Sequence, residues 1–213
     1  QLDTPVPGYR KNRTYRDLLD FLASFPDSSI VELDVVEGAG GNSGPVLLTL
    51  FFRNCSLMLL FLLPGDRRKY VQDVFDLLLS ELGPQTYSQL FPIILTDNGS
   101  SFLDPSLFEM PHRQDVLTKV FYCDPMSSWQ KGRLEKNHEF IRYILPKRTS
   151  FDSLTEQKVN LMMNHINSTA RASLNSCTPF QLALLLLDAK LMSLMDLRSV
   201  PADQIHLKPD LIK

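Results

Sequence analysis

The chain has 213 residues, of which 44% are hydrophobic and 22% charged, and this is enough apolar sequence to build one domain around one substantial core. The formal net charge of −2 excludes a globally basic nucleic-acid binder, so any such function must come from local clusters of basic residues. The three cysteines lie far apart with no metal-ligand spacing, which argues against structural zinc and favours a reducing compartment. Polar residues interrupt the most apolar stretches, which argues against membrane spans.

The N-terminal segment, residues 1–14, is rich in proline and basic residues, which is typical of a linker or arm. No signal peptide is visible, and a start at Gln1 without methionine leads us to expect a fragment of a longer protein. A short helix is predicted from Tyr15 to Ser24, because Thr14 can cap it and the apolar residues that follow share one face.

Three apolar segments come next, with short links between them, at residues 28–38, 45–52 and 56–63. Their composition and short connections predict three strands in an antiparallel meander. In the first strand, Glu32 and Asp34 point to the face opposite Leu33.

In the second half of the chain, the sequence predicts helices as well as strands. An amphipathic helix is predicted over 69–82, and the short, wholly apolar "FPIIL" then predicts a buried parallel strand. A helical turn at about 105–109 leads to a fifth strand, "TKVFY", and three further helices are predicted at about 129–143, 155–167 and 179–197. This order predicts an α/β fold, with a mixed five-stranded sheet of three antiparallel strands and then two parallel ones, flanked by helices.

Three acidic residues occupy informative places in this scheme. Asp34 lies in the middle of the first strand, Asp97 just past the end of the fourth, and Glu135 on the helix after the fifth. A carboxylate in an otherwise apolar strand is costly unless it is paired or bound to metal. If the fourth strand pairs beside the first, Asp34 and Asp97 lie side by side, and a helix that crosses the sheet end can add Glu135.

Such a cluster suits two Mg²⁺ or Mn²⁺ ions about 3.5–4 Å apart, with open positions for water and phosphate. Each acid also has an ordinary interpretation when taken alone. "DNG" is a common turn, Asp34 can lie on a solvated face, and Glu135 can be an exposed helical residue. Glu32 and Glu139 are interpreted as solvated groups or as supports behind the metal ligands.

A basic helix surface accompanies Glu135. Lys131, Glu135, His138 and Arg142 share one stripe of the predicted helix, and residues 131–148 contain six basic residues against two acids. This local excess favours a surface that follows a phosphate backbone. Trp129 can stack on a base, although packing under the helix is the alternative, and Asn98 can orient Asp97 or contact DNA. The candidate DNA-contact residues are Lys131, Arg133, Lys136, His138, Arg142, Asn98 and Trp129.

At this point the sequence resembles a known family. "VELDVVEG", "LTDNGSSF", "FYCDPMSSWQKGRLEKNHEFIRYILPKRTSF" and "INSTARASLNSCTPFQLALLL" are similar to the catalytic core of bacterial insertion-sequence transposases. The most similar group is insertion sequence thirty, in the retroviral-integrase-like, DDE superfamily. The similarity runs from about Tyr15 to Leu187, and the "DPMSSWQKGRLEKNHEFIR" block is its most specific part.

The resemblance implies a ribonuclease H-like catalytic core over 15–197, with 198–213 as a C-terminal tail. It implies catalytic and metal-binding roles for Asp34, Asp97 and Glu135, with cleavage at transposon ends and transfer of the 3′-hydroxyl into target DNA. The implied partners are double-stranded DNA and at least a second copy of the chain, in the bacterial cytoplasm at the nucleoid, without a membrane.

The sequence also departs from the family pattern. The interval between Asp97 and Glu135 is slightly longer than the resemblance leads us to expect, with "FEMPHRQDV" as the candidate insertion. The family carries an N-terminal helix-turn-helix that recognises transposon ends, and we expect this chain to lack it. "NSTARAS" lacks one basic position of the family pattern, which puts a DNA contact near Arg171 in doubt. Two other functions stay open: a ribonuclease H-like nuclease that never joins strands, and a non-catalytic DNA-binding or assembly module of a degraded element.

Overall fold

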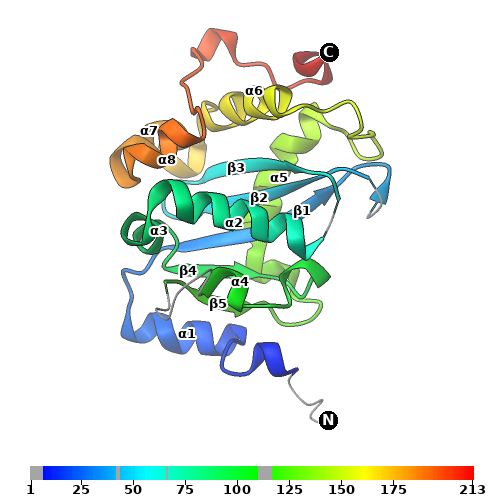
Figure 1. Cartoon of the computed structure of the whole chain (residues 1–213). Helices are drawn as coiled ribbons and strands as arrows, with labels where there is room; N and C mark the ends of the chain where they lie inside the picture. Colours follow the sequence, from blue (N-terminus) through cyan, green and yellow to red (C-terminus); the bar gives the residue numbers. More distant parts are fainter. Residues whose placement is uncertain (1–6, 42–43, 66, 110–116) are drawn as a thin grey trace.

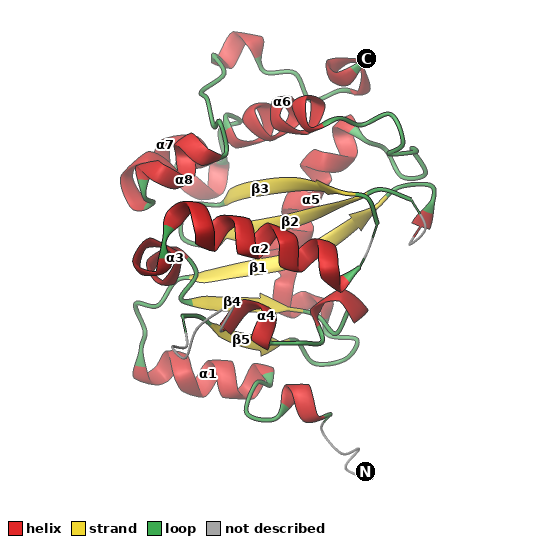
Figure 2. Ribbon diagram, in the orientation of Figure 1, coloured by secondary structure: helices red, strands yellow, loops and turns green. Residues whose placement is uncertain are grey.

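The protein folds around one mixed five-stranded sheet with the order β3-β2-β1-β4-β5 (Figures 1 and 2). The computed structural model describes residues 7–41, 44–65, 67–109 and 117–213. The strands are β1 (Ile30–Glu37), β2 (Val46–Phe52), β3 (Leu57–Leu63), β4 (Ile93–Thr96) and β5 (Lys119–Tyr122). β1, β2 and β3 form the predicted antiparallel meander, and β4 and β5 add in parallel beside β1, so the predicted fold class is confirmed.

The register of this sheet determines where the acids emerge. β1 and β4 are parallel, with Glu32 opposite Leu95. Two residues further along both strands, the same offset puts Asp34 beside Asp97, just where β4 ends and the chain turns away. On the other side of β1, Asp34 is paired with Thr49 of β2.

Eight α-helices surround the sheet within the described residues. α2 and α3 lie over one face and α5 crosses the opposite face, while α1 lies beside β5 and α6 beside β3 (Figure 1). Their bounds are α1 (Tyr15–Ser24), α2 (Arg68–Leu82), α3 (Pro84–Leu90), α4 (Ser106–Glu109), α5 (Gly132–Ile144), α6 (Glu156–Asn167), α7 (Pro179–Leu186) and α8 (Ala189–Leu194). None of the described helices is long and apolar enough to cross a membrane.

The helix predictions hold with three differences. The predicted helix 179–197 is broken into α7 and α8, because Leu187 is extended and the Asp188 side chain accepts the Lys190 N–H as a new N-cap (2.7 Å). α3 was not predicted; it starts directly at Pro84, a residue that suits a first helical turn. The predicted helix 129–143 opens as a 3₁₀ turn, η4 (Ser128–Lys131), before α5 begins.

The predicted N-terminal arm and the predicted C-terminal tail both pack on the predicted core. The described part of the predicted arm, 7–14, runs along β5, where the Tyr122 N–H donates to the Arg13 carbonyl (2.8 Å) and Arg13 pairs with Glu109. The tail 198–213 packs on α5 and α6 through η7 (Pro209–Ile212), and the His206 N–H donates to His165 Nδ1 (3.1 Å). Residues 1–6 of the arm and most of the candidate insertion, 110–116, lie outside the described residues.

Candidate active site

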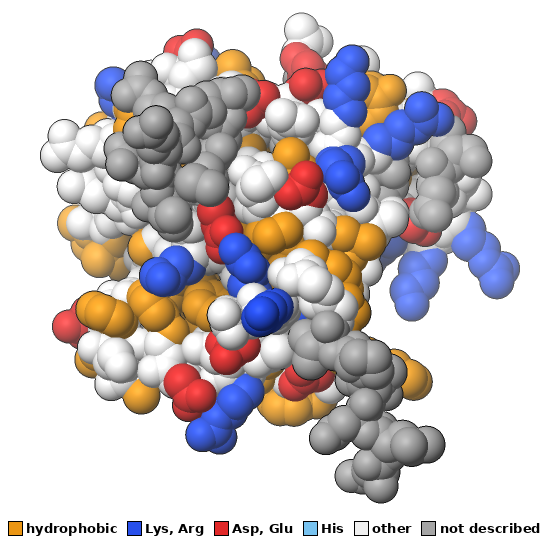
Figure 3. All heavy atoms as spheres, turned by 60° about the horizontal axis from the view of Figure 1, so that its bottom comes forward, with side chains coloured by type: hydrophobic (Ala, Val, Ile, Leu, Met, Phe, Trp, Pro, Cys, Tyr) orange, Lys and Arg blue, Asp and Glu red, His pale blue; other side chains and the backbone are white. Residues whose placement is uncertain are grey.

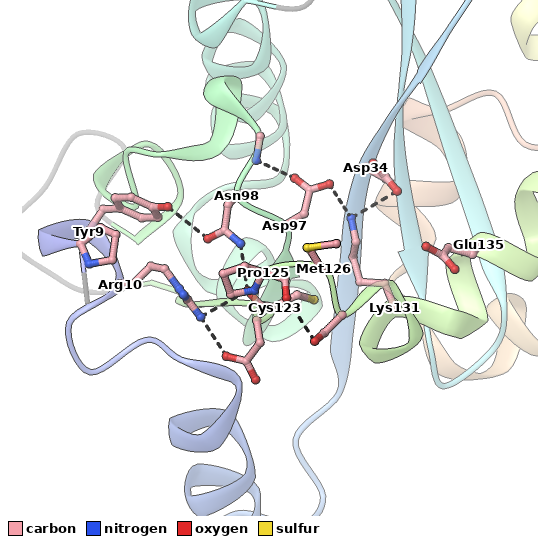
Figure 4. Close-up of a pocket in the computed structure, with 14 residues that line it drawn as sticks. Tyr9, Arg10, Asp34, Asp97, Asn98, Cys123, Pro125, Met126, Lys131 and Glu135 are labelled. Carbon is pink, nitrogen blue, oxygen red and sulfur yellow. Dashed lines mark hydrogen bonds and ion pairs between the residues drawn. The ribbon is translucent and has the colours of Figure 1, made fainter. Parts of the chain in front are cut away.

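Asp34, Asp97 and Glu135 line one open cavity of about 610 Å³, beside the middle of β1 and the end of β4 (Figure 4). The loop 123–127, Lys131, the turn residues Asn98 and Gly99, and the N-terminal residues Pro7, Tyr9 and Arg10 form the rest of its wall. Strand, turn and helix therefore each bring one of the predicted acids to the same hollow.

The carboxylates of Asp34 and Asp97 are held in fixed orientations. Asp34 Oδ1 accepts the N–H of Val35 (2.8 Å), and Asp97 Oδ1 accepts the N–H of Gly99 (2.8 Å). The second contact is an Asx-type turn, and a side chain on Gly99 would collide with Asp97 Oδ1, so the glycine is needed for this close approach. Both Oδ2 atoms are left to bind a cation.

That cation is the ammonium of Lys131, which lies between the two aspartates (Figure 4). Its Nζ is 3.2 Å from Asp34 Oδ2 and 3.1 Å from Asp97 Oδ2, and it also donates to the carbonyl of Leu33 (3.1 Å). Only 3% of the Lys131 side chain is exposed. All three ammonium protons thus have acceptors inside the protein.

The electrostatics of this cluster reflect burial and close charges. Burial raises the pKa of Asp34, and the Asp97 carboxylate raises it further, while Lys131 opposes the shift. Burial alone would lower the pKa of Lys131, but the two carboxylates outweigh it and raise that pKa. The ammonium is therefore charged at neutral pH, and it compensates the paired negative charge.

Glu135 stands a little apart from this pair. It lies in the first turn of α5 with an exposed side chain, and Figure 4 shows it on the same side of the cavity as Asp34. Across the described residues, no group of three or more His, Cys, Asp or Glu side chains is arranged to hold one ion. The structure thus brings two predicted acids onto one cation and the third to the edge of the same cavity.

A residue that was interpreted as solvated holds α5 in place. Glu32 is fully buried; it accepts the Leu134 N–H at the start of α5 (2.9 Å) and pairs with Arg53. Arg53 also donates to the carbonyl of Gln130 (2.9 Å). The interpretation of Glu32 as solvated was wrong. The alternative interpretation, a support behind the metal ligands, agrees with its contacts, because Glu32 fixes the helix turn that carries Glu135.

Side-chain hydrogen bonds and an ion pair also fix the loop between β5 and α5. Gln130 accepts the Asp124 N–H (2.7 Å) and donates to the Asp124 carboxylate (3.0 Å). Arg10 pairs with the same carboxylate (2.9 Å). The predicted arm therefore closes one side of the cavity. Sequence reasoning missed Arg53, Asp124 and Gln130, because each acts through partners far away along the chain.

The predicted DNA-contact residues divide into two groups. Asn98 donates to the Cys123 carbonyl (3.0 Å) and accepts from Tyr9, and Arg142 donates to the Glu37 carbonyl (3.1 Å). Together with Lys131, these side chains use their polar atoms inside the protein. Three others are exposed: Arg133, Lys136 and Trp129.

Trp129 is 70% exposed and makes an edge contact with Tyr15. On the face turned forward in Figure 3, basic side chains are dispersed among acidic and hydrophobic ones, without one continuous basic patch. Any phosphate contacts on this face would come from individual side chains.

His138 and Arg171 are both bound within the protein. His138 Nε2 is 3.0 Å from the Thr49 hydroxyl, which donates to the Asp34 carbonyl, and burial together with Lys131 and Arg142 lowers its pKa to about 4. The Arg171 guanidinium is buried over the Phe140 ring, 3.3 Å from its centroid. The doubtful DNA contact at Arg171 thus has a packing role that joins the "NSTARAS" segment to α5.

The aspartate pair fits a hard divalent ion. Two carboxylate oxygens already converge on a single cation, and carboxylate oxygen is the ligand that Mg²⁺ and Mn²⁺ prefer. Thiol ligands are a poor alternative, because burial raises the pKa of the nearby Cys123 to about 12.

Comparison with known proteins supports the same class of protein. The chain is 36% identical over 61 residues to transposase InsI of insertion sequence element IS30A from Escherichia coli (strain K12), covering 29% of this chain and 16% of that protein. It is 29% identical over 90 residues to the transposase of insertion sequence element IS4351 from Bacteroides fragilis, covering 42% and 26%. It is 32% identical over 63 residues to the transposase of IS1086 from Cupriavidus metallidurans, covering 30% and 19%. These matches span about a quarter of each relative or less. No protein-family model matches the chain.

Solved structures agree on the fold. The catalytic core domain of BIV integrase superposes with a TM-score of 0.51 at 14% identity, over 73% of this chain and 93% of that one. A chain of the simian T-cell lymphotropic virus intasome in complex with the PP2A regulatory subunit B56 gamma gives a TM-score of 0.54 at 14% identity, over 72% and 53%. The homologues are therefore transposases of IS30 and other insertion sequences, and the fold is the ribonuclease H-like fold of integrase catalytic cores, as the sequence resemblance led us to expect.

Proposed function

We propose that this chain is the catalytic core of a DNA transposase, which cleaves a phosphodiester at a transposon end and joins the freed 3′-hydroxyl to target DNA. The observation that carries the proposal is the convergence of Asp34 and Asp97, from two adjacent parallel strands, on one cation in a cavity that Glu135 also lines. Transposases among the relatives and integrase cores among the structural neighbours support the same class of reaction.

In this proposal Asp34, Asp97 and Glu135 would hold the divalent ions. Bound ions would activate the attacking oxygen and stabilise the leaving oxygen. In the first step, an oxygen of water bonds to phosphorus as the bond to the 3′-oxygen breaks, which frees the 3′-hydroxyl. In the second, that 3′-oxygen bonds to a phosphorus of the target as a target strand is cut.

The protein's own contribution is position. The Val35 and Gly99 amides fix the two carboxylates, and Glu32 fixes the first turn of α5. Phosphoryl transfer depends mainly on such positioning and on charge neutralisation. DNA would approach the open side of the cavity. Arg133, Lys136 and Trp129 are exposed on the segment that also carries Lys131 and Glu135, and they are suited to contact phosphates and a base.

Single substitutions at the three acids test this function. We expect Asp34→Asn, Asp97→Asn and Glu135→Gln each to lower Mn²⁺-dependent nicking of DNA at least about 100-fold, since each removes an anionic ligand. Glu139→Gln is the matched control, because Glu139 is exposed one turn further along the same helix. Full activity of any of the three variants would remove that residue from the site.

Pre-cut DNA separates strand transfer from simple hydrolysis. Oligonucleotides with a free 3′-hydroxyl are supplied with Mn²⁺ and a target plasmid, and joined products are expected. Nicking without joined products would favour a nuclease. The absence of both, together with no Mn²⁺ binding, would favour a non-catalytic module.

A further inference from the structure

We propose that Lys131 is a tethered counter-ion that occupies the cation position between Asp34 and Asp97 and leaves it when a divalent ion binds. The inference rests on the proposed function, because it concerns the same pair of carboxylates. It assigns to Lys131 a role in setting the affinity of the site for metal.

The first argument is the direction of the carboxylate oxygens. Asp34 Oδ1 and Asp97 Oδ1 each accept a backbone N–H, so the atoms available to a cation are the two Oδ2 atoms. Both Oδ2 atoms contact the same ammonium, at 3.2 and 3.1 Å. Lys131 and a metal ion would therefore use the same ligand atoms.

The second argument is distance. Mg²⁺ binds oxygen at about 2.0–2.1 Å, so an ion shared by both Oδ2 atoms would lie nearer to them than Nζ does. It would stand between the oxygens and the ammonium, so close to Nζ that the two cations repel each other. The two cations exclude one another from this position.

The third argument is that the lysine is built into the fold. Lys131 is the last residue of η4 and directly precedes α5, and its neighbour Gln130 is tied to Asp124 and Arg53. Its Nζ also has a third acceptor in the Leu33 carbonyl. Such a contact set stabilises the metal-free protein, in which the two neighbouring carboxylates would otherwise repel each other.

Displacement gives the ammonium a second use. The tether keeps it within the cavity that Asp97 and Glu135 line, where a DNA phosphate offers a new anionic partner. Metal loading and substrate contact would then be coupled through one side chain.

Calorimetry with Mn²⁺ tests the competition. Lys131→Met keeps the length and apolar stem of the side chain but removes the charge, and we expect it to bind Mn²⁺ roughly ten-fold or more tightly than the wild-type protein does. Lys190→Met, at an exposed lysine of α8, is the matched control and leaves the affinity unchanged. Equal or weaker binding by Lys131→Met would overturn the inference while leaving the proposed function intact. Failure of both proteins to bind Mn²⁺ would remove the metal site itself and the inference with it.

A second measurement uses the wild-type protein, so it does not depend on the variant folding. Lysine acylation followed by mass spectrometry reports the accessibility of each ammonium. Lys131 should be protected without metal and should react several-fold faster at saturating Mg²⁺, whereas Lys136 reacts at the same rate in both. Continued protection of Lys131 under conditions where calorimetry shows the ion bound would overturn the displacement.

Discussion

Glu32 shows how one buried side chain can support a neighbouring site. Its carboxylate has no exposure and joins Arg53 to the N–H of Leu134, so β1 carries both an acid of the cavity and the anchor of the helix opposite. A carboxylate at a helix N-terminus is also favoured by the helix dipole. Because Glu32 lies two residues before Asp34 on the same strand, β1 both presents an acid to the cavity and anchors the start of α5.

Replacing Glu32 with Gln should destabilise the fold. The variant leaves Arg53 next to a neutral amide in a shielded position, and we expect a loss of roughly 3 kcal/mol in the free energy of unfolding. Urea denaturation checks this, with Glu139→Gln as the exposed control. A loss below about 0.5 kcal/mol, the usual range of surface substitutions, would contradict the proposed anchoring.

His138 gives the protein a dependence on acid. Burial, Lys131 and Arg142 lower its pKa to about 4, against an ordinary value of about 6.5 in the unfolded chain. The unfolded state therefore takes up the proton first as the pH falls, so the stability present above about pH 6.5 is lost progressively toward pH 4.

The His138→Gln variant separates this effect from other acid titrations. The urea concentration at the midpoint of unfolding should fall between pH 7 and pH 4.5, and this fall should be smaller in the variant than in the wild-type protein. The His138 ring should also stay neutral at pH 5.5 in an NMR titration. An equal fall in both proteins, or an imidazole that titrates near pH 6.5, would contradict the assignment.

At the scale of elements, the join between α6 and β3 explains part of the "INSTARAS" pattern. The Asn167 amide donates to the Met58 carbonyl (2.8 Å) and accepts the Met58 N–H (2.9 Å), so it pairs with this edge of the sheet as another strand would. Four residues later Arg171 packs on Phe140 of α5. Asn167 thus connects α6 to β3 and Arg171 connects the following loop to α5, and neither residue lines the cavity.

We expect Asn167→Ala to lower the free energy of unfolding by about 2 kcal/mol, because it leaves two buried backbone groups without partners. Thermal unfolding measures the loss, and the Mn²⁺ affinity at a temperature where the variant is folded should equal that of the wild-type protein. A changed affinity would show that the contact between Asn167 and Met58 also affects the metal site.

The elements that could be predicted from the sequence are those with a strong local signal. Thr14 with Asp17 forms a capping box, and α1 begins and ends where it was predicted. The break between α7 and α8 could not be predicted in the same way, because it comes within an apolar run without Gly or Pro and rests on the Asp188 cap. α3 was missed because its seven residues have little periodicity.

At the scale of the whole molecule, sheet order links distant residues. Asp34 and Asp97 were expected side by side once β4 was placed next to β1, and the observed register explains that outcome. The position of Lys131 could not be predicted, since helical spacing assigns it to a stripe but says nothing about which oxygens its ammonium meets. The buried roles of Glu32 and Arg53 depend on contacts that the fold alone creates.

Metal binding should be visible in the stability of the whole protein. A ligand that binds only the folded state raises the unfolding temperature, and the rise grows with the logarithm of the ratio of its concentration to its Kd. We expect millimolar Mn²⁺ to raise the melting temperature of the wild-type protein and to have little effect on Asp34→Asn or Asp97→Asn. Sodium chloride at equal ionic strength serves as the control, and an equal shift in all three proteins would indicate binding elsewhere.

The most direct test of the account is a crystal of this protein grown with Mn²⁺ and measured for anomalous scattering. The account predicts an anomalous peak bound by Oδ2 of Asp34 and Oδ2 of Asp97, with Glu135 turned toward it and the Lys131 ammonium moved away. Diffraction that shows no manganese at this position, with Lys131 still bridging the two aspartates at saturating Mn²⁺, would contradict it.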